Sequence, residues 1–175
     1  YQNLGAGAWF KFRDVDNDND YDLYTENPFS NIRYYRNSGT PTQPVFTALF
    51  DTLRDVVGQP IQIEGFSLPE WSDIDCDGDA DLFLGRENGR ITFYENLGLD
   101  ANNLPRFTFV TDTFQGIDIQ TGGGESFTSH AGLHGANALT LVDIDNDADN
   151  DLFWGDFFAS SLIHLENYGS CNSPL

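Results

Sequence analysis

The sequence predicts an all-β fold built from repeated units of about four short antiparallel strands. Three observations lead to this prediction. A pattern with aspartate at every second position occurs three times, a second short signature follows each copy at a nearly fixed distance, and no stretch reads as a convincing helix. Short strands in a repeat of several tens of residues are typical of the blades of a β-propeller.

The acidic pattern is eleven residues long and ends in an apolar pair. It reads DVDNDNDYDLY at residues 14–24, DIDCDGDADLF at residues 73–83 and DIDNDADNDLF at residues 143–153. Two carboxylates about 4 Å apart repel each other by roughly 4 kcal/mol at an effective dielectric constant of 20. Calcium accepts six to eight oxygen ligands from a flexible loop. The three copies therefore predict three sites for a divalent cation.

The second signature ends in Asn-x-Gly, which is a turn signal because both residues tolerate a positive φ. YRNSG at 35–39 and YENLG at 94–98 each begin 21 residues after the first aspartate of the preceding loop, and LENYG at 165–169 begins 22 residues after it. A fourth copy, YQNLG at 1–5, has no acidic loop before it. The two signatures together define an internal repeat with spacers of variable length.

Short runs around the loops predict the strands. Each loop is followed by an apolar run and then by an alternating strand, and two units add a further strand after a proline. The apolar runs are 23–24, 82–84 and 152–154, the alternating strands contain 32–34, 91–93 and 162–164, and the last strands are 45–49 and 106–110.

These elements divide the chain into a single array of three predicted blades. Blade 1 covers residues 1–50, with the tail of a preceding repeat at 1–5; blade 2 covers 51–115; and blade 3 covers 116–175, with a glycine-rich insertion at 116–136. Three loops would give an incomplete propeller or one that is completed by other chains.

The charge of the chain is concentrated in the loops. The formal net charge is −20, from 8 basic and 28 acidic residues, and 15 of the acids lie in the three loops. Nucleic acid is not expected as a partner, because the chain has no basic face to neutralise phosphates. No apolar run approaches the ~20 residues that span a bilayer, so direct membrane insertion is not expected either.

Two features bear on the compartment. The chain contains no methionine, so we expect a processed product or a piece of a longer protein. Calcium loops of modest affinity suit the calcium-rich exterior, which predicts an extracellular, secreted or cell-surface protein.

Cys76 and Cys171 either pair with each other, as an oxidising compartment allows, or remain two unpaired thiols.

The positions within a loop have different tasks. In a chain that wraps around one calcium ion, positions 1, 3, 5 and 9 supply side-chain oxygens and position 7 supplies a carbonyl, while position 6 turns sharply and favours glycine. Gly78 fills position 6 in the second loop, Asn19 in the first and Ala148 in the third. Because alanine is strained at such a turn, the third site is the least favourable. Magnesium would keep several waters and need fewer carboxylates.

The loops, followed by Asp-Leu-Phe and then by Tyr-x-Asn-x-Gly, resemble FG-GAP/VCBS repeats, the blades of integrin-α-like β-propellers that secreted bacterial proteins carry in arrays. The resemblance covers nearly the whole chain. It implies side-chain calcium ligands at positions 1, 3, 5 and 9, which are Asp14, Asp16, Asp18, Asp22, Asp73, Asp75, Asp77, Asp81, Asp143, Asp145, Asp147 and Asp151. It implies carbonyl ligands at position 7, which are Asp20, Asp79 and Asp149.

Other candidate chemistry is weak. His130 and His134 have the spacing of a zinc pair on a helix, but the glycines around them favour a loop. Ser126 or Ser129 beside His130 has no identifiable acid to orient the imidazole. No catalytic site and no cofactor other than calcium are predicted, and the chain is not expected to be an enzyme.

We therefore predict a non-catalytic extracellular calcium-binding module for cell-surface adhesion or for a self-assembling fibre or ring. Its partner would be a protein or glycan outside the cell, or copies of itself arranged head to tail. The alternative is a carbohydrate-binding or accessory domain of a secreted polysaccharide-active enzyme. In that case Trp9, Trp71 or Trp154 would stack on sugars, although each lies beside a repeat signature and suits a core position.

Overall fold

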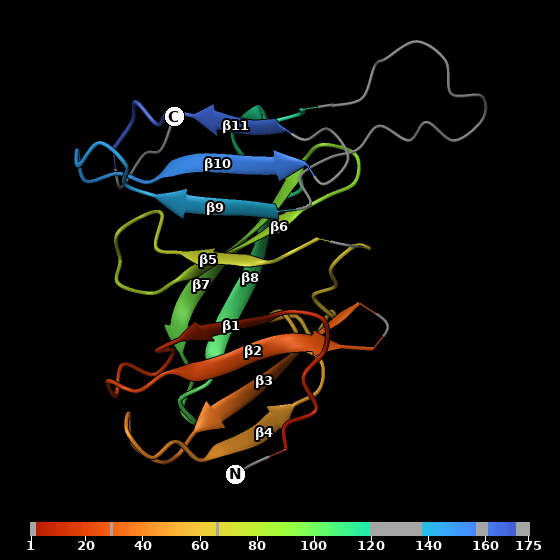
Figure 1. Ribbon diagram of the computed structural model, residues 1–175, viewed down its shortest axis with the longest axis vertical. Helices are drawn as coiled ribbons and strands as arrows, with labels where there is room; N and C mark the ends of the chain where they lie inside the picture. Colours follow the sequence, from red (N-terminus) through yellow and green to blue (C-terminus); the bar gives the residue numbers. More distant parts are fainter. Residues whose placement is uncertain (1–2, 29, 66, 120–137, 157–160, 171–175) are drawn as a thin grey trace. The chain divides into compact units, whose positions relative to one another are not determined.

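A computed structural model describes residues 3–28, 30–65, 67–119, 138–156 and 161–170 (Figure 1). Within these ranges the chain forms eleven strands and one short 3-10 turn, η1 (Phe114–Gly116), and no α-helix. The all-β fold class predicted from the sequence is confirmed for this part of the chain. No helical segment in it has the length and hydrophobicity needed to cross a bilayer.

The strands form three separate antiparallel sheets (Figure 1). Sheet 1 has the order β1 (Phe10–Arg13), β2 (Asp22–Asn27), β3 (Asn31–Asn37), β4 (Phe46–Phe50). Sheet 2 has the order β5 (Glu70–Ser72), β6 (Asp81–Gly85), β7 (Ile91–Leu99), β8 (Pro105–Thr111). Sheet 3 has the order β11 (Ser161–Leu165), β10 (Asp151–Asp156), β9 (Ala138–Val142).

The apolar runs that follow the acidic loops become the second strand of each sheet. Leu23 in β2, Leu82 in β6 and Leu152 in β10 are all buried, and each strand is paired on both sides. In β6 both faces are covered, since Leu82, Phe83 and Leu84 are all buried, and a run that is covered on both faces can be apolar throughout. The meander predicted from the repeat is thus present in every sheet, with four strands in the first two and three described strands in the last.

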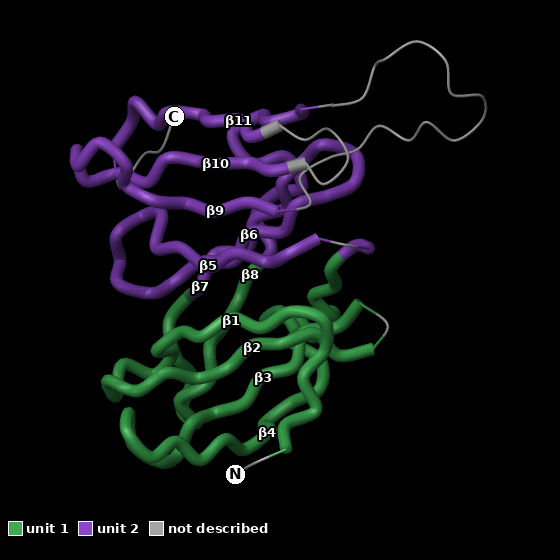
Figure 2. The backbone as a smooth tube through the Cα atoms, in the orientation of Figure 1, with its two compact units in different colours: residues 1–63, 97–108 green, residues 64–96, 109–175 purple. Residues whose placement is uncertain are grey.

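The chain divides into two compact units (Figure 2). Unit 1 consists of residues 1–63 and 97–108, and unit 2 consists of residues 64–96 and 109–175. The boundary passes through β7 and β8, so it does not coincide with the borders between sheets. The three sheets fall one in each of the predicted blades 1–50, 51–115 and 116–175. The division into blades and their closure into a propeller stay predictions.

Leu23 and Tyr35 are buried on one face of sheet 1, and a further part of the core of unit 1 lies on the opposite face. Ile32 and Tyr34 of β3 are fully buried there, and Tyr34 packs against Tyr24 of β2 with ring centroids 5.0 Å apart. The segment after β4 returns over β3, where the backbone nitrogen of Leu53 donates to the Ile32 carbonyl at 2.8 Å.

The core of unit 2 is formed where sheet 3 packs on sheet 2. Phe83 of β6 and Ile91 of β7 pack with Phe114 of η1, and Leu139 of β9 and Trp154 of β10 cover them. The residues before and after the predicted insertion thus meet in one core, whereas residues 120–136 of the insertion lie outside the described residues.

Candidate metal sites

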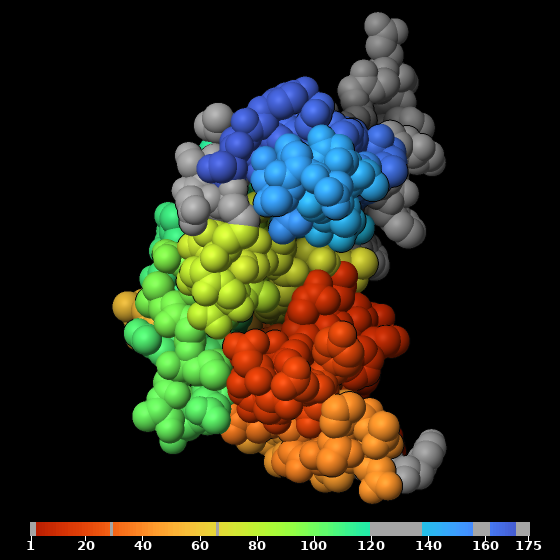
Figure 3. All heavy atoms as spheres, turned by 90° about the vertical axis from the view of Figure 1, so that its left-hand side faces the viewer, coloured from red at the N-terminus to blue at the C-terminus, as the bar shows by residue number. Residues whose placement is uncertain are grey.

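Each acidic loop connects the first two strands of its sheet, β1 to β2, β5 to β6 and β9 to β10. We number its residues 1 to 9 and call residues 14–22 loop 1, residues 73–81 loop 2 and residues 143–151 loop 3. Figure 3 shows each loop at the surface of its own unit, in red, yellow-green and light blue.

The carboxylates of positions 1, 3 and 5 converge in all three loops. Each residue of a triplet offers one oxygen, and the three oxygens lie within 4.8 Å of one another. The triplets are Asp14, Asp16 and Asp18; Asp73, Asp75 and Asp77; and Asp143, Asp145 and Asp147. These three triplets could hold a metal ion, because hard cations bind such groups of carboxylate oxygens.

The three loops are shaped by the same two hydrogen bonds. The backbone nitrogen of position 6 donates to Oδ2 of position 1, at 3.0 Å in loop 1, 3.0 Å in loop 2 and 3.1 Å in loop 3. The backbone nitrogen of position 7 donates to Oδ1 of position 5, at 3.0, 2.9 and 3.2 Å. Aspartate side chains commonly bond the backbone of residues that follow them, which turns the chain around the carboxylates.

The sharp turn at position 6 is where the sequence predicted it. The φ angle is 97° at Gly78, 70° at Asn19 and 75° at Ala148, so the alanine of loop 3 does adopt a left-handed conformation. Such a conformation costs alanine roughly 1 kcal/mol or more.

Position 4 is left-handed as well, which sequence reasoning missed. Its φ angle is 57° at Asn17, 61° at Cys76 and 66° at Asn146. The asparagine in loops 1 and 3 was a signal that could have revealed it, since asparagine tolerates this conformation. Cys76 is disulfide-bonded, which excludes the alternative of two unpaired thiols. Cys171 lies outside the described residues.

The aspartate at position 9 is buried and lies outside the triplets. Asp22, Asp81 and Asp151 each accept a hydrogen bond from the backbone nitrogen of the signature asparagine, at 2.7, 2.8 and 2.8 Å. In loops 2 and 3 the second oxygen accepts a bond from the backbone nitrogen of position 2, at 3.3 and 3.4 Å. The residue predicted as a calcium ligand therefore also fastens the loop to the signature asparagine, which lies in the third strand of sheets 1 and 2 and two residues beyond β11 in sheet 3.

The side chain of the signature asparagine forms a second hydrogen bond with the loop. Asn96 donates from Nδ2 to the Ala80 carbonyl at 3.1 Å, and Asn167 donates to the Asn150 carbonyl at 3.4 Å, both at position 8 of a loop. The signature and the loop thus form one hydrogen-bonded unit, which explains their nearly constant separation in the sequence.

The side chain at position 7 is more enclosed than its predicted role requires. Sequence reasoning assigned only the carbonyl of this residue to the cation, but Asp20 and Asp149 are buried and Asp79 is half-buried. Oδ1 of Asp20 and Oδ1 of Asp149 have no hydrogen-bond partner, and neither has Oδ1 of Asp73. A buried carboxylate oxygen without a partner is unfavourable unless a cation neutralises it, so these atoms fit a bound metal.

The electrostatics of the loops favour the uptake of positive charge. Burial raises the pKa of Asp81 to about 7. Burial, followed by repulsion from neighbouring carboxylates, raises the pKa of Asp16, Asp20, Asp79, Asp145 and Asp149. A proton or a metal ion relieves the same repulsion, so the two compete for these oxygens.

The surroundings distinguish loop 1 from the others. The guanidinium of Arg36, the middle residue of the first Tyr-x-Asn signature, lies 3.5 Å from Oδ2 of Asp16. The equivalent residues of the other two signatures are Glu95 and Glu166. A fixed positive charge beside a ligand opposes a cation, so the site in loop 1 is handicapped in a way the aspartate spacing did not reveal.

Loops 2 and 3 are in direct contact within unit 2. Nδ2 of Asn150 donates to Oγ of Ser72 at 2.9 Å and to the Asp73 carbonyl at 3.3 Å. Asn150 occupies position 8 of loop 3, whereas Asp73 is the first residue of loop 2. The geometry of one loop therefore bears on the geometry of the other.

The other candidate residues, the tryptophans, serines and histidines, are either buried in the core or outside the described residues. Trp9, Trp71 and Trp154 are all buried, which confirms the core interpretation. Ser126, Ser129, His130 and His134 lie outside the described residues. His164 stacks on Phe153 with ring centroids 4.5 Å apart.

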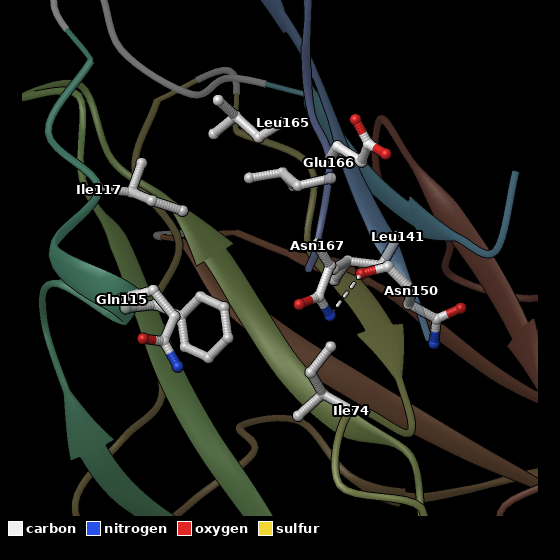
Figure 4. Close-up of a pocket in the computed structure, with 10 residues that line it drawn as sticks. Ile74, Gln115, Ile117, Leu141, Asn150, Leu165, Glu166 and Asn167 are labelled. Atoms are coloured by element: carbon white, nitrogen blue, oxygen red, sulfur yellow. Dashed lines mark hydrogen bonds between the residues drawn. The ribbon is translucent and has the colours of Figure 1, made fainter. Parts of the chain in front are cut away.

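A small pocket of about 210 Å³ lies beside loop 3 in unit 2 (Figure 4). Gln115 and Ile117 lie on one side of it, and Leu165 and Asn167 lie on the other. The pocket is below the usual range of ~300–1,000 Å³ for small-molecule sites, and its lining is mostly apolar. We assign it no ligand.

Comparisons with protein-family models, with curated proteins and with solved structures find no match to this chain.

Proposed function

We propose that the chain is a non-catalytic extracellular module that binds three calcium ions and uses them to fix its sheets. The observation that carries the proposal is the threefold repetition of one loop geometry, in which three carboxylates converge within 4.8 Å. One acidic cluster is common on protein surfaces, but three with the same internal hydrogen bonds indicate a shared task.

Calcium suits these loops better than other common metals. The groups that converge are carboxylates, which are hard ligands, and position 7 adds buried oxygens without partners in two loops. Five carboxylates per loop exceed what magnesium requires, since magnesium keeps several waters. The resemblance to FG-GAP/VCBS repeats supports the same choice, and with it we propose that the sheets are blades of a propeller.

The bound ion would stabilise the module by closing each loop. The loop is bonded to the third strand of its sheet through position 9 and the signature asparagine, as in the pair Asp81 and Asn96. In unit 2 it is also bonded to the next loop through Asn150. A cation that organises the carboxylates would therefore stabilise contacts within and between sheets.

The extracellular location rests on two arguments. The disulfide at Cys76 is typical of an oxidising compartment. Loops of this kind bind calcium with modest affinity, which suits a calcium-rich exterior. A protein or glycan ligand outside the cell, or further copies of the chain, remain the proposed partners. The carbohydrate-binding alternative gains no support, because the three tryptophans that were to stack on sugars are buried.

A calorimetric calcium titration of the calcium-free protein tests the proposal. We expect three binding events per chain, and two in the variant Asp75→Asn, which removes a carboxylate from the triplet of loop 2. Asp112→Asn is the matched control, because it removes one exposed carboxylate outside the loops and should leave three events. Binding of magnesium with equal affinity would contradict the choice of calcium, and no binding of either ion would contradict the proposal.

A further inference from the structure

Sheet 3 exposes a face that is covered in the other two sheets. Strand registers make the faces directly comparable. Phe83 pairs with Phe93 and Gly85 with Ile91 in sheet 2, and Phe153 pairs with His164 and Gly155 with Leu162 in sheet 3. Leu162 thus occupies the position of Ile91, and His164 that of Phe93.

The exposure of these equivalent residues differs sharply. Ile91 is 1% exposed because sheet 3 packs over it, and Ile32, at the same position of sheet 1, is fully buried. Leu162 is 71% exposed, and beside it the rings of Phe153 and His164 stack at 4.5 Å. The covered face of sheet 2 therefore has an uncovered counterpart on sheet 3, which we call the acceptor face (Phe153, Leu162 and His164).

Sheet 1 exposes a face that corresponds to the one with which sheet 3 packs on sheet 2. In sheet 3, Leu139 and Leu141 of β9 pack against the core that contains Phe83. Their pairing partners are Trp154 and Leu152 of β10.

The same register in sheet 1 places Phe10 opposite Thr25 and Phe12 opposite Leu23. Phe10 is 62% exposed and Phe12 is 43% exposed, and their rings contact each other at 6.0 Å. Phe12 also contacts Phe46 of β4 at 6.2 Å. We call Phe10, Phe12 and Phe46 the donor face.

We infer that the donor face of one chain packs on the acceptor face of a second copy, repeating between chains the contact that sheets 2 and 3 make within unit 2. The occupant is a second copy because this chain carries both halves of the contact. The apolar residues Phe153 and Leu162 on one half, and Phe10 and Phe12 on the other, are at register positions that are covered elsewhere in the chain. Large apolar side chains exposed together are typical of interaction sites in soluble proteins.

The two faces are different surfaces, so the contact is heterologous and generates a ring or a filament. The inference deepens the proposed function by naming a partner for the module. It rests on the proposed function only in treating the chain as an interaction module. Calcium plays no part in the argument from the strand registers.

Sedimentation velocity of the full chain in calcium, over a wide range of protein concentration, tests the inference. We expect species larger than the monomer for the native chain, and only monomer for Phe10→Glu and for Leu162→Glu, because each variant places a charge in one face. Val57→Glu is the matched control, since Val57 is a highly exposed apolar residue outside both faces, and it should assemble like the native chain.

Mixing the two variants gives the sharper result. Phe10→Glu keeps a working acceptor face and Leu162→Glu keeps a working donor face, so an equimolar mixture should form a dimer and nothing larger. A monomeric native chain at every concentration, or a mixture that remains monomeric while circular dichroism shows both variants folded, would overturn the inference. Calcium titration of the same samples keeps the two proposals separate, because a monomer that binds three ions contradicts only the assembly.

Discussion

The carboxylate of Asp81 accepts a 2.8 Å hydrogen bond from the backbone nitrogen of Asn96, and this bond joins the acidic loop of sheet 2 to its third strand, β7. The same relationship links Asp22 to Asn37 at 2.7 Å and Asp151 to Asn167 at 2.8 Å. The two signatures of the repeat are therefore parts of one structural unit. The bonded partners are 15, 15 and 16 positions apart in the sequence, and this bond explains why the two signatures keep a nearly constant separation.

The first prediction concerns this bond. Asp81→Ala should lower the free energy of unfolding by about 2 kcal/mol, because it leaves the buried backbone nitrogens of Asn96 and Ile74 without acceptors. Urea denaturation in calcium-free buffer measures the loss without any contribution from metal binding. Asp112→Ala, at an exposed acid outside the loops, should change stability by less than ~0.5 kcal/mol. Equal effects of the two variants would show that Asp81 has no special structural role.

The second prediction concerns pH. Burial raises the pKa of Asp81 from 3.8 to about 7, so between about pH 4 and pH 7 the folded calcium-free chain binds more protons at this residue than the unfolded chain does. Its contribution to stability is therefore present at low pH and is lost as the pH rises through that window.

Denaturation of the calcium-free protein at a series of pH values measures this dependence. Asp81→Asn does not titrate and should flatten it. Calcium affinity should change in the opposite sense and fall as the pH is lowered, because protons compete for the same carboxylates. A calcium-free chain whose stability rises steadily from pH 4 to pH 7 in this window would contradict the assigned pKa of Asp81.

The third prediction concerns the strained alanine. Ala148→Gly should stabilise the calcium-free protein by about 1 kcal/mol, since glycine adopts the 75° φ angle of position 6 without the clash of a Cβ atom. Gly78→Ala is the reciprocal control in loop 2 and should destabilise by a similar amount, because the φ angle there is 97°. Thermal denaturation of both variants measures the effect, and a destabilising Ala148→Gly would show that loop 3 does not hold this conformation.

The fourth prediction concerns Arg36. Arg36→Gln should strengthen calcium binding in loop 1 by up to about fivefold, because it removes a positive charge 3.5 Å from Oδ2 of Asp16. The partly exposed position of the pair limits the effect to about 1 kcal/mol. Calorimetric titration of the variant resolves the affected site, and Arg54→Gln is the control, since Arg54 bonds the Gly58 carbonyl in a turn outside the loops. Unchanged affinities in Arg36→Gln would mean that Arg36 does not act on the bound ion.

Much of the fold could be predicted from the sequence because the same pattern of loop and strands occurs three times. The apolar runs after the loops, such as 82–84, had to be buried strands. The predicted turn at Asn-x-Gly ends β3 at Asn37, but β7 continues through the signature to Leu99. The predicted fourth strands at 45–49 and 106–110 agree with β4 and β8 to within one residue at every boundary. Local turn chemistry also identified position 6, where Gly78 needs a positive φ.

Other features depend on neighbours that no local pattern reveals. The charge of Arg36 matters only because β3 places it beside Asp16. The exposure of Leu162 could not be predicted, because its sequence environment matches that of the buried Ile91 and only the packing of another sheet distinguishes them. The burial of Asp20 at position 7 likewise arises from packing and not from spacing.

The melting temperature in calcium and in excess chelator tests the central claim most directly. At a free calcium concentration 100 times the dissociation constant, each site adds roughly 2.7 kcal/mol, so three sites together correspond to a shift of more than ~10 °C for a chain of this size. We predict that chelation lowers the melting temperature by at least that amount and that added calcium restores it. A melting temperature that is the same in calcium and in chelator would contradict the assignment of the loops as calcium sites.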